Sequence, residues 1–302
     1  MKILVCDPIA QEGIDYLKKY AEVDVKLKQK PEELLAIVGD YDALVVRSET
    51  KIPAAAIEKG RRLQVIGRAG SGVDNIDVAA ATQRGIVVVN APTGNTIAAA
   101  EHSLAMMLAL ARHIPQACSK LRSGVWDRSS YMGTELRNKT LGVVGLGNVG
   151  SEVARRAQGF QMRIVGYDPF ISPEYARNLG VEPLPLEELV KVSDFITFHL
   201  PLNDSTRGMI GEKQIATMKP SVRLINCARG GLIDETALSQ AVKEGKIAGA
   251  AVDVFTKEPA TDNPLLDCDR IIVTPHLGAS TAEAQVSVAI DVAEQIVMVL
   301  EG

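Results

Sequence analysis

The fold of this chain is decided by the stretch Leu141-Gly-Val-Val-Gly145-Leu-Gly147-Asn-Val-Gly150. It passes from an apolar strand through a glycine-rich turn into a predicted helix over residues 151–158, and a second predicted strand over 163–167 leads to Asp168. A G-x-G-x-x-G pattern occurs by chance in many loops. In this strand–turn–helix–strand setting, however, it predicts a dinucleotide-binding βαβ unit.

The glycines and the acidic residue each have an expected task in such a unit. Gly145 permits the tight turn, Gly147 lets the backbone approach a pyrophosphate at the positive end of the helix, and Gly150 lets helix and strand pack closely. The Asp168 carboxylate can accept hydrogen bonds from the ribose hydroxyls of NAD, whereas it would repel the 2′-phosphate of NADP. NAD is therefore the predicted cofactor. The alternative is a turn without a ligand, in which Asp168 only caps the segment before Pro169.

Apolar runs of strand length alternate with helical stretches along the whole chain. The expected strands fall into a first set, 3–6, 23–26, 43–46, 64–66 and 86–89, and a second set, 141–144, 163–167, 195–197, 223–226, 248–252 and 271–273. Strands separated by helices need crossover connections, so the predicted class is α/β, with two Rossmann-like, doubly wound parallel-sheet domains. A long helical stretch over 95–122 separates the two sets. The last stretch, 281–300, either covers the second sheet or returns to the first.

Composition agrees with two globular domains and excludes several classes of protein. The chain has 302 residues, of which 46% are hydrophobic and 23% charged, and its net charge of -4 comes from well-mixed residues. This pattern argues against a nucleic-acid-binding or membrane-seeking surface and favours a small-molecule ligand. The longest apolar run, 97–111, is too short to cross a bilayer. The four cysteines are far apart and unpaired in sequence, which favours reduced thiols and a cytoplasmic protein.

Arg229 is the expected carboxylate-binding residue. It stands in Asn226-Cys-Ala-Arg229-Gly-Gly231, directly after the strand predicted over 223–226, where an open α/β sheet presents its ligand site. The planar guanidinium matches a substrate carboxylate and can orient the carbon that exchanges a hydride. The alternative is an ordinary surface salt bridge.

His276 and Glu258 are the expected acid–base pair. His276 follows the strand predicted over 271–273, and an imidazole at that point can take the hydroxyl proton as a hydride leaves. Glu258 also follows a strand and can hold the histidine ring, although its spacing alone fits an ordinary solvated carboxylate equally well. Of the other histidines, His102 and His113 are expected to pack or face solvent, and His199 to line the cofactor site.

The chain resembles the D-isomer-specific 2-hydroxyacid dehydrogenases, and within them the D-3-phosphoglycerate dehydrogenases, over nearly its whole length. The motifs that carry the resemblance are VVRSET, GRAGSGVDNID, MGTEL, KTLGVVGLGNVG, GYDPF, INCARGG, DVFTKEP and TPHLGAS. The resemblance implies the same catalytic roles for Arg229, Glu258 and His276. It also implies a discontinuous substrate-binding domain of residues 1–93 and 279–302, an NAD-binding domain of residues 94–278, and an active-site cleft between them.

Matched motif positions imply further site residues. Those expected to line the NAD site, besides the three glycines, are Ser71, Asn148, Val149, Asp168, Cys227, Ala228, Arg229, Asp253, His276, Leu277, Gly278 and Ala279. Those expected to face substrate are Arg47, Ser71, Gly72, Asn95, Arg229 and His276. For a substrate phosphate the candidate cations are Arg47 and, less favoured, Arg68 and Arg128. No metal ion is expected.

The resemblance also implies a reaction and a partner. The expected reaction is oxidation of D-3-phosphoglycerate to 3-phosphohydroxypyruvate with NAD, the first step of serine biosynthesis. The alternatives are a glyoxylate or hydroxypyruvate reductase, another D-2-hydroxyacid dehydrogenase and, in a different class, an NAD-sensing corepressor. NAD-binding domains of this family pair into homodimers, with the segment around Trp126 and Arg128 crossing to the neighbour. Because the sequence ends at Gly302, a C-terminal serine-sensing domain is not expected.

Overall fold

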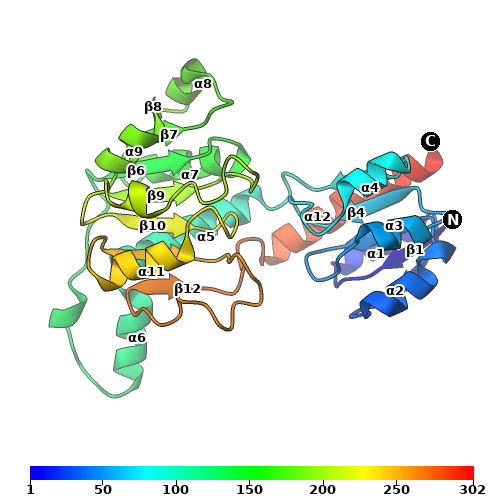
Figure 1. Cartoon of the computed structure of the whole chain (residues 1–302), viewed down its shortest axis with the longest axis horizontal. Coiled ribbons are helices and arrows are strands. Elements are labelled where there is room, and N and C mark those ends of the chain that lie inside the picture. Colours follow the sequence, from blue (N-terminus) through cyan, green and yellow to red (C-terminus); the bar gives the residue numbers. More distant parts are fainter. The chain divides into compact units, whose positions relative to one another are not determined.

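The computed structural model describes residues 1–302, and contacts divide the chain into two units. The first contains Met1–Thr96 and Ala279–Gly302, and the second contains Ile97–Gly278. The boundaries expected from the sequence were 93/94 and 278/279, within three residues of those in the structure. Each unit is built on a parallel sheet with helices on both faces, so the predicted α/β class with two Rossmann-type domains is confirmed (Figure 1).

The first unit has a five-stranded sheet in the order β2-β1-β3-β4-β5. Its strands are β1 (Lys2–Val5), β2 (Glu22–Val25), β3 (Ala43–Val46), β4 (Val65–Arg68) and β5 (Val87–Asn90). Its helices are α1 (Gln11–Leu17), α2 (Pro31–Ile37), α3 (Ala54–Lys59), α4 (Val78–Gln83) and α12 (Ala282–Glu301), with a 3₁₀ turn over Val38–Asp40. Helices α2, α3 and α4 cover one face of the sheet, and α1 and α12 cover the other.

Helix α12 therefore joins the first unit, one of the two alternatives that sequence periodicity leaves open. It packs against α1, β4 and β5. Gly67 of β4 explains how closely it approaches, because a Cβ added there would lie 2.5 Å from side-chain atoms of both Val292 and Ile296. Strand β3 is buried along its whole length, as expected for a parallel strand that is covered on both faces.

The second unit has a seven-stranded sheet in the order β12-β11-β10-β9-β6-β7-β8, with every pair parallel. Its strands are β6 (Thr140–Val144), β7 (Arg163–Tyr167), β8 (Glu182–Pro183), β9 (Phe195–Phe198), β10 (Arg223–Asn226), β11 (Gly249–Val252) and β12 (Ile271–Val273). The strand order reverses between β6 and β9. In open α/β sheets the ligand site lies at the carboxyl ends of the strands beside such a reversal.

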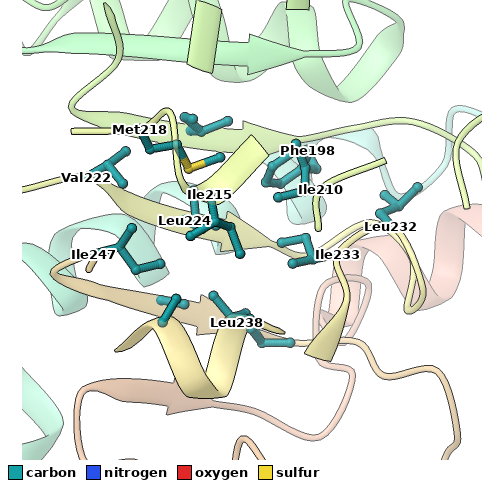
Figure 2. Close-up of a cluster of buried hydrophobic side chains, with 14 of the residues drawn as sticks. Phe198, Ile210, Ile215, Met218, Val222, Leu224, Leu232, Ile233, Leu238 and Ile247 are labelled. Carbon is teal, nitrogen blue, oxygen red and sulfur yellow. The ribbon is translucent and has the colours of Figure 1, made fainter. Parts of the chain in front are cut away.

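Helices cover both faces of this sheet as well. The helices on its faces are α5 (Thr96–Ala111), α7 (Asn148–Gln158), α8 (Pro173–Asn178), α9 (Leu186–Val192), α10 (Glu212–Ile215) and α11 (Glu235–Lys243). Helix α6 (Ile114–Arg122), which has no buried residue, and a 3₁₀ turn over Ser129–Tyr131 complete the elements of this unit. Figure 2 shows the core on the face covered by α9, α10 and α11, where Phe198 and Leu224 of the sheet lie among side chains such as Ile215 and Leu238. Helices α5, α7 and α8 pack on the opposite face.

The prediction of one continuous helical stretch over residues 95–122 is wrong. The stretch divides into α5 and α6 at His113, whose φ of 52° lies in the left-handed region. The cause is Pro115, which has no N–H to donate to the carbonyl of Ala111 four residues earlier. That carbonyl instead accepts a hydrogen bond of 2.9 Å from the N–H of Thr134. No helix in the chain is both long enough and apolar enough to span a membrane.

Candidate functional site

The glycine loop between β6 and α7 has the backbone geometry that its sequence predicts. Gly145 has a φ of 97°, and a Cβ there would lie 2.5 Å from the carbonyl oxygen of His199. Gly150 packs so tightly that a Cβ would lie 1.8 Å from the carbonyl oxygen of Gly145. A Cβ on Gly147, in contrast, would meet no atom within 4 Å. Two of the glycines thus serve packing, and the third leaves open space in front of the helix.

The open space lies at the N-terminus of α7, where a dinucleotide pyrophosphate fits. Gly147 is the N-cap residue and offers no side chain to satisfy the first N–H groups of the helix, including those near Asn148 and Val149. Uncapped N–H groups together with the helix dipole attract an anion. The residues present therefore suit the phosphates of NAD.

Asp168 lies at the end of β7, beside the glycine loop. Its Oδ2 accepts a hydrogen bond of 2.8 Å from the N–H of Leu146, and its Oδ1 accepts one of 2.9 Å from the N–H of Phe170. Because each carboxylate oxygen has two lone pairs, both can still accept a ribose hydroxyl. The backbone bonds hold the carboxylate in place for that contact.

His276 and Glu258 meet at the carboxyl-end side of the same sheet. His276 Nδ1 lies 2.8 Å from Glu258 Oε2, and Glu258 Oε1 accepts a hydrogen bond of 3.0 Å from the N–H of Phe255. Burial alone would raise the pKa of the Glu258 carboxyl. The bonds from His276 and Phe255 outweigh burial and hold that pKa below its ordinary value. The imidazole is thus oriented by a carboxylate at Nδ1, which leaves Nε2 to act on a ligand.

The turn that carries His276 is built around one buried carboxylate. The side chain of Asp253 has no exposed surface. It accepts hydrogen bonds from Thr274 Oγ1 (2.6 Å), from the N–H of Leu277 (2.7 Å) and from the N–H of Gly278 (2.8 Å), while its backbone carbonyl accepts the N–H of His276 at 2.9 Å. His276 itself has a φ of 56°, so this network holds a left-handed conformation that is uncommon for a non-glycine residue.

The contact of His102 with Asp253 was not predicted from the sequence, which led us to expect His102 to pack or face solvent. Its Nε2 on α5 lies 3.3 Å from Asp253 Oδ1. Burial would raise the pKa of the Asp253 carboxyl, but the bonds from His102, Thr274 and Leu277 lower it. The pattern of α5 contains no signal for this pairing, because it depends on a residue 151 positions later in the chain.

His102, Asp253 and Cys227 also place one potential metal-ligand atom each within 4.8 Å of one another. Burial and the charge of Asp253 raise the pKa of the Cys227 thiol to about 12, so the thiolate that a metal needs is disfavoured. We interpret the contact of His102 with Asp253 as part of the hydrogen-bond network around Asp253. The remaining histidine of interest, His199, is kept neutral because burial lowers its pKa to about 3, and its Nε2 lies 2.9 Å from Thr197 Oγ1.

Arg229 lies on the loop after β10, with Cys227 and Ala228 before it. Its Nη1 donates a hydrogen bond of 2.7 Å to the carbonyl of Ala228, and its own carbonyl accepts one of 2.9 Å from Asn226 Nδ2. Gly230 is packed against the neighbouring loop, because a Cβ there would lie 2.0 Å from the carbonyl of Phe255. The loops that carry Arg229 and Glu258 are therefore in direct backbone contact.

A cavity of about 380 Å³ adjoins the histidine and the glutamate. Its walls come from the loop after β11 and from the end of β12, and they are formed by Phe255, Glu258, Pro259, Ala260, Thr261, Leu266, Val273, Thr274, Pro275 and His276. Most of these side chains are apolar. The cavity therefore adjoins the His276–Glu258 pair, whose side chains are 42% and 37% exposed.

In the first unit, Arg47 follows β3 and is half-buried. Its Nη1 donates to Gln285 Oε1 of α12, and its Nε is buried without a hydrogen-bond partner. Burial lowers the pKa of Arg47, against the opposing charges of Asp7 and Glu49. A half-buried guanidinium at the end of a sheet strand can bind an anionic ligand.

Two further expected substrate residues lie together in the first unit. Ser71 Oγ donates a hydrogen bond of 2.5 Å to Asn95 Oδ1, which leaves the Asn95 amide N–H groups to other acceptors. Asn90 Nδ2 donates to the carbonyl of Ser71, so the loop that also contains Gly72 is tied to the end of β5. Arg68 Nε lies 3.3 Å from Asn75 Oδ1. Ala279, expected at the NAD site, is the first residue of the returning segment of this unit.

Comparison with known proteins assigns the second unit. Residues 104–278 match the family model described as D-isomer specific 2-hydroxyacid dehydrogenase, NAD binding domain. The chain is also 52% identical to a D-3-phosphoglycerate dehydrogenase of Archaeoglobus fulgidus and 54% identical to one of Methanocaldococcus jannaschii. Each alignment covers 100% of this chain and 58% of the relative. The chain thus spans little more than half the length of these curated relatives.

Solved structures agree with the fold along the whole chain. The TT0316 protein from Thermus thermophilus has a TM-score of 0.93 and 34% identity, with coverage of 100% of this chain and 97% of that one. D-Lactate dehydrogenase from Aquifex aeolicus, complexed with NAD and lactic acid, has a TM-score of 0.89 and 27% identity, with coverage of 100% and 96%. Both similarities extend over the first unit as well as the second.

Proposed function

The chain belongs to the D-isomer-specific 2-hydroxyacid dehydrogenase family, and from that premise we propose that it oxidises D-3-phosphoglycerate to 3-phosphohydroxypyruvate with NAD. The observation that carries the chemistry is the 2.8 Å contact between His276 Nδ1 and Glu258 Oε2, at the carboxyl-end side of a sheet with a dinucleotide-type glycine loop. The choice of substrate is supported by 52% and 54% identity to D-3-phosphoglycerate dehydrogenases of two other organisms, in alignments that cover all of this chain and 58% of each relative. This reaction would be the entry step of serine biosynthesis.

His276 is the proposed proton acceptor. Oxidation of the alcohol removes a hydride from C2 and a proton from the hydroxyl, and bound NAD supplies the acceptor for the hydride. With Nδ1 held by Glu258, His276 takes the hydroxyl proton at Nε2 and returns it in the reverse direction. The Glu258 carboxylate stabilises the imidazolium that forms, because opposite charges at 2.8 Å attract.

Arg229 and Arg47 are the proposed anion-binding residues. A phosphorylated three-carbon acid has an anion at each end, so it needs two cationic partners. Arg229 binds the carboxylate beside the reacting carbon. Arg47 meets the phosphate, for which a guanidinium directly after β3 is suited. Ser71, Gly72 and the Asn95 amide complete the substrate contacts from the first unit.

Asp168 makes NAD the proposed cofactor in preference to NADP. The carboxylate is held by two backbone N–H groups and would repel a 2′-phosphate at the ribose position. Gly147, Asn148 and Val149 bind the pyrophosphate, and the segments around Cys227 and Gly278 complete the site. Asp253 contributes to this site indirectly, because its carboxylate holds the turn that carries His276, Leu277 and Gly278.

We further propose a homodimer formed through the second unit. Helix α6 has no buried residue, and the segment after it lies away from the sheet in Figure 1. This arm, residues 113–132, exposes 78% of Trp126 and 86% of Met132, together with Ile114 and Leu121. Exposed apolar side chains gathered on one segment are typical of an interaction surface.

We also propose a cytoplasmic location, with which the four free cysteines agree.

A substrate panel tests the proposal. NADH formation would be followed by its absorbance with D-3-phosphoglycerate, D-glycerate and D-lactate, and NADH consumption with glyoxylate and hydroxypyruvate, all at one ionic strength. The catalytic efficiency is expected to be highest for D-3-phosphoglycerate. A higher efficiency for glyoxylate or hydroxypyruvate would assign the chain to the reductases of the same family. The unphosphorylated acids serve as the matched controls for the phosphate contact.

A further inference from the structure

Glu235, on the first turn of α11, holds both ends of the segment that carries Glu258. Its Oε1 accepts hydrogen bonds from the N–H of Thr256 at 2.6 Å and from Thr256 Oγ1 at 2.8 Å. Its Oε2 accepts one of 2.6 Å from Asn263 Nδ2. The Glu235 side chain is therefore bonded to both ends of segment 256–263, and Glu258 lies between the two bonded residues. We call this arrangement the clasp.

Helix capping does not account for this side chain. The N-cap of α11 is Asp234, whose Oδ1 already accepts the N–H groups of Thr236 and Ala237 at 3.0 Å each. The Glu235 carboxylate turns away from the helix and accepts its hydrogen bonds from the loop. A carboxylate suits the position because it accepts only, and all three groups that face it are donors.

The rest of the segment has few other constraints. Its start lies against Gly230, and its end is held by Ser239 Oγ, which donates 2.8 Å to the carbonyl of Pro264. Glu258 itself accepts a hydrogen bond from the N–H of Phe255 and contacts His276 Nδ1. Without Glu235, Phe255 would still lie against Gly230 and Pro264 would still be bonded to Ser239, but Thr256 and Asn263 would lose the three bonds that hold the two ends of the segment.

We propose that Glu235 is a positioning residue for the reaction: it fixes segment 256–263 so that Glu258 can hold His276 at Nδ1. This inference rests on the proposed function for its effect on turnover. Glu235 touches neither substrate nor cofactor and acts through Glu258. A small displacement of a catalytic group away from its reactive geometry lowers the rate of the chemical step more than it weakens substrate binding.

Steady-state kinetics of two variants test the proposal. Glu235→Ala is expected to lower kcat about tenfold to a hundredfold, while the KM for the 2-hydroxy acid and the Kd for NAD change less than about threefold. Glu235→Gln keeps one accepting oxygen for Thr256 but cannot accept from Asn263, so it should restore part of the lost kcat. The control is Glu187→Ala, which removes an exposed acid from the first turn of α9 and should leave kcat unchanged. An unchanged kcat in Glu235→Ala would overturn the proposal.

A double-mutant cycle distinguishes positioning from a general loss of stability. If Glu235 acts through Glu258, then adding Glu235→Ala to Glu258→Gln should lower kcat by less than about twofold further. If the double variant instead loses kcat by the product of the two single-variant factors, Glu235 acts independently of Glu258, and the proposed role is wrong.

Hydrogen exchange gives a readout that does not depend on activity. In Glu235→Ala the amides of segment 256–263 are expected to exchange at least about tenfold faster, with those of β10 and β11 unchanged. Equal exchange in the variant and the unmodified protein would contradict the clasp. If the unmodified protein oxidises no 2-hydroxy acid, the proposed function fails, and the exchange measurement still decides whether Glu235 holds the segment.

Discussion

Asp253→Asn is the substitution that most directly probes the turn behind His276. The change keeps the shape of the side chain but replaces one accepting oxygen by an NH₂ group. In the unmodified protein Oδ1 accepts from Thr274 and Leu277, and Oδ2 accepts from Gly278. Whichever way the amide is turned, at least one backbone N–H will face a donor, buried and without a partner.

The size of the effect follows from that loss. A buried donor left unpaired costs about 1–3 kcal/mol, and we take about 2 kcal/mol. The second unit has about 180 residues, for which each kcal/mol shifts Tm by roughly 2–4 °C. The Tm of this unit should therefore fall by about 4–8 °C. Turnover should fall about tenfold, because the left-handed turn that positions His276 loosens.

The pH dependence of the stability difference has a definite sign. The pKa of Asp253 is lowered in the folded protein, so its charged form contributes stability above the unfolded pKa of about 3.9. That contribution is lost as the pH falls through the lower folded pKa. The Tm difference between the unmodified protein and Asp253→Asn should thus be present above about pH 5 and shrink below about pH 4.

Calorimetry and steady-state kinetics measure both effects, with Asp204→Asn as the control because Asp204 is exposed and makes no side-chain hydrogen bond. A Tm within about 1 °C of the unmodified protein, together with unchanged turnover, would refute the reasoning about Asp253.

Four further predictions follow from the proposed site. Asp168→Ala should narrow the preference for NAD over NADP, measured as the ratio of kcat/KM values, and equal use of both cofactors by the unmodified protein would exclude the proposed role. His276→Ala should lower kcat at least about a hundredfold with NAD affinity nearly intact by calorimetry, whereas a loss of only a few-fold would remove His276 from proton transfer. Arg47→Ala should raise the KM for D-3-phosphoglycerate at least about tenfold but alter that for D-glycerate much less, and parallel losses would point to a general defect of the pocket. Trp126→Ala should shift the protein from dimer to monomer in sedimentation velocity, and a stable dimer would place the interface elsewhere.

The architecture was accessible from the sequence because strand and helix signals alternate so regularly. Expected and observed strands agree closely, for example at 43–46 and 163–167. Strand β8 was missed because two residues carry no periodicity. The break between α5 and α6 had a local signal in Pro115, which the apolar run around it obscured. The destination of α12 had none, because its contacts with α1 and β4 are tertiary.

The candidate site divides in the same way. Residues that follow strands, such as Glu258 and His276, could be placed near one another because parallel strands end at one edge of a sheet. The roles of Asp253, His102 and Glu235 were not accessible, because each depends on hydrogen bonds to segments distant in sequence. Periodicity identifies which face of a helix is apolar, but not which buried polar group accepts its hydrogen bonds.

The proposed reaction moves a hydride from C2 of D-3-phosphoglycerate to NAD. The most direct measurement uses D-3-phosphoglycerate carrying deuterium at C2, with the keto product trapped by hydrazine, and mass spectrometry of the reduced cofactor. Direct hydride transfer from C2 should place one deuterium on each reduced cofactor, with 3-phosphohydroxypyruvate hydrazone formed in equal amount. No reduced cofactor, or reduced cofactor without deuterium, would contradict it.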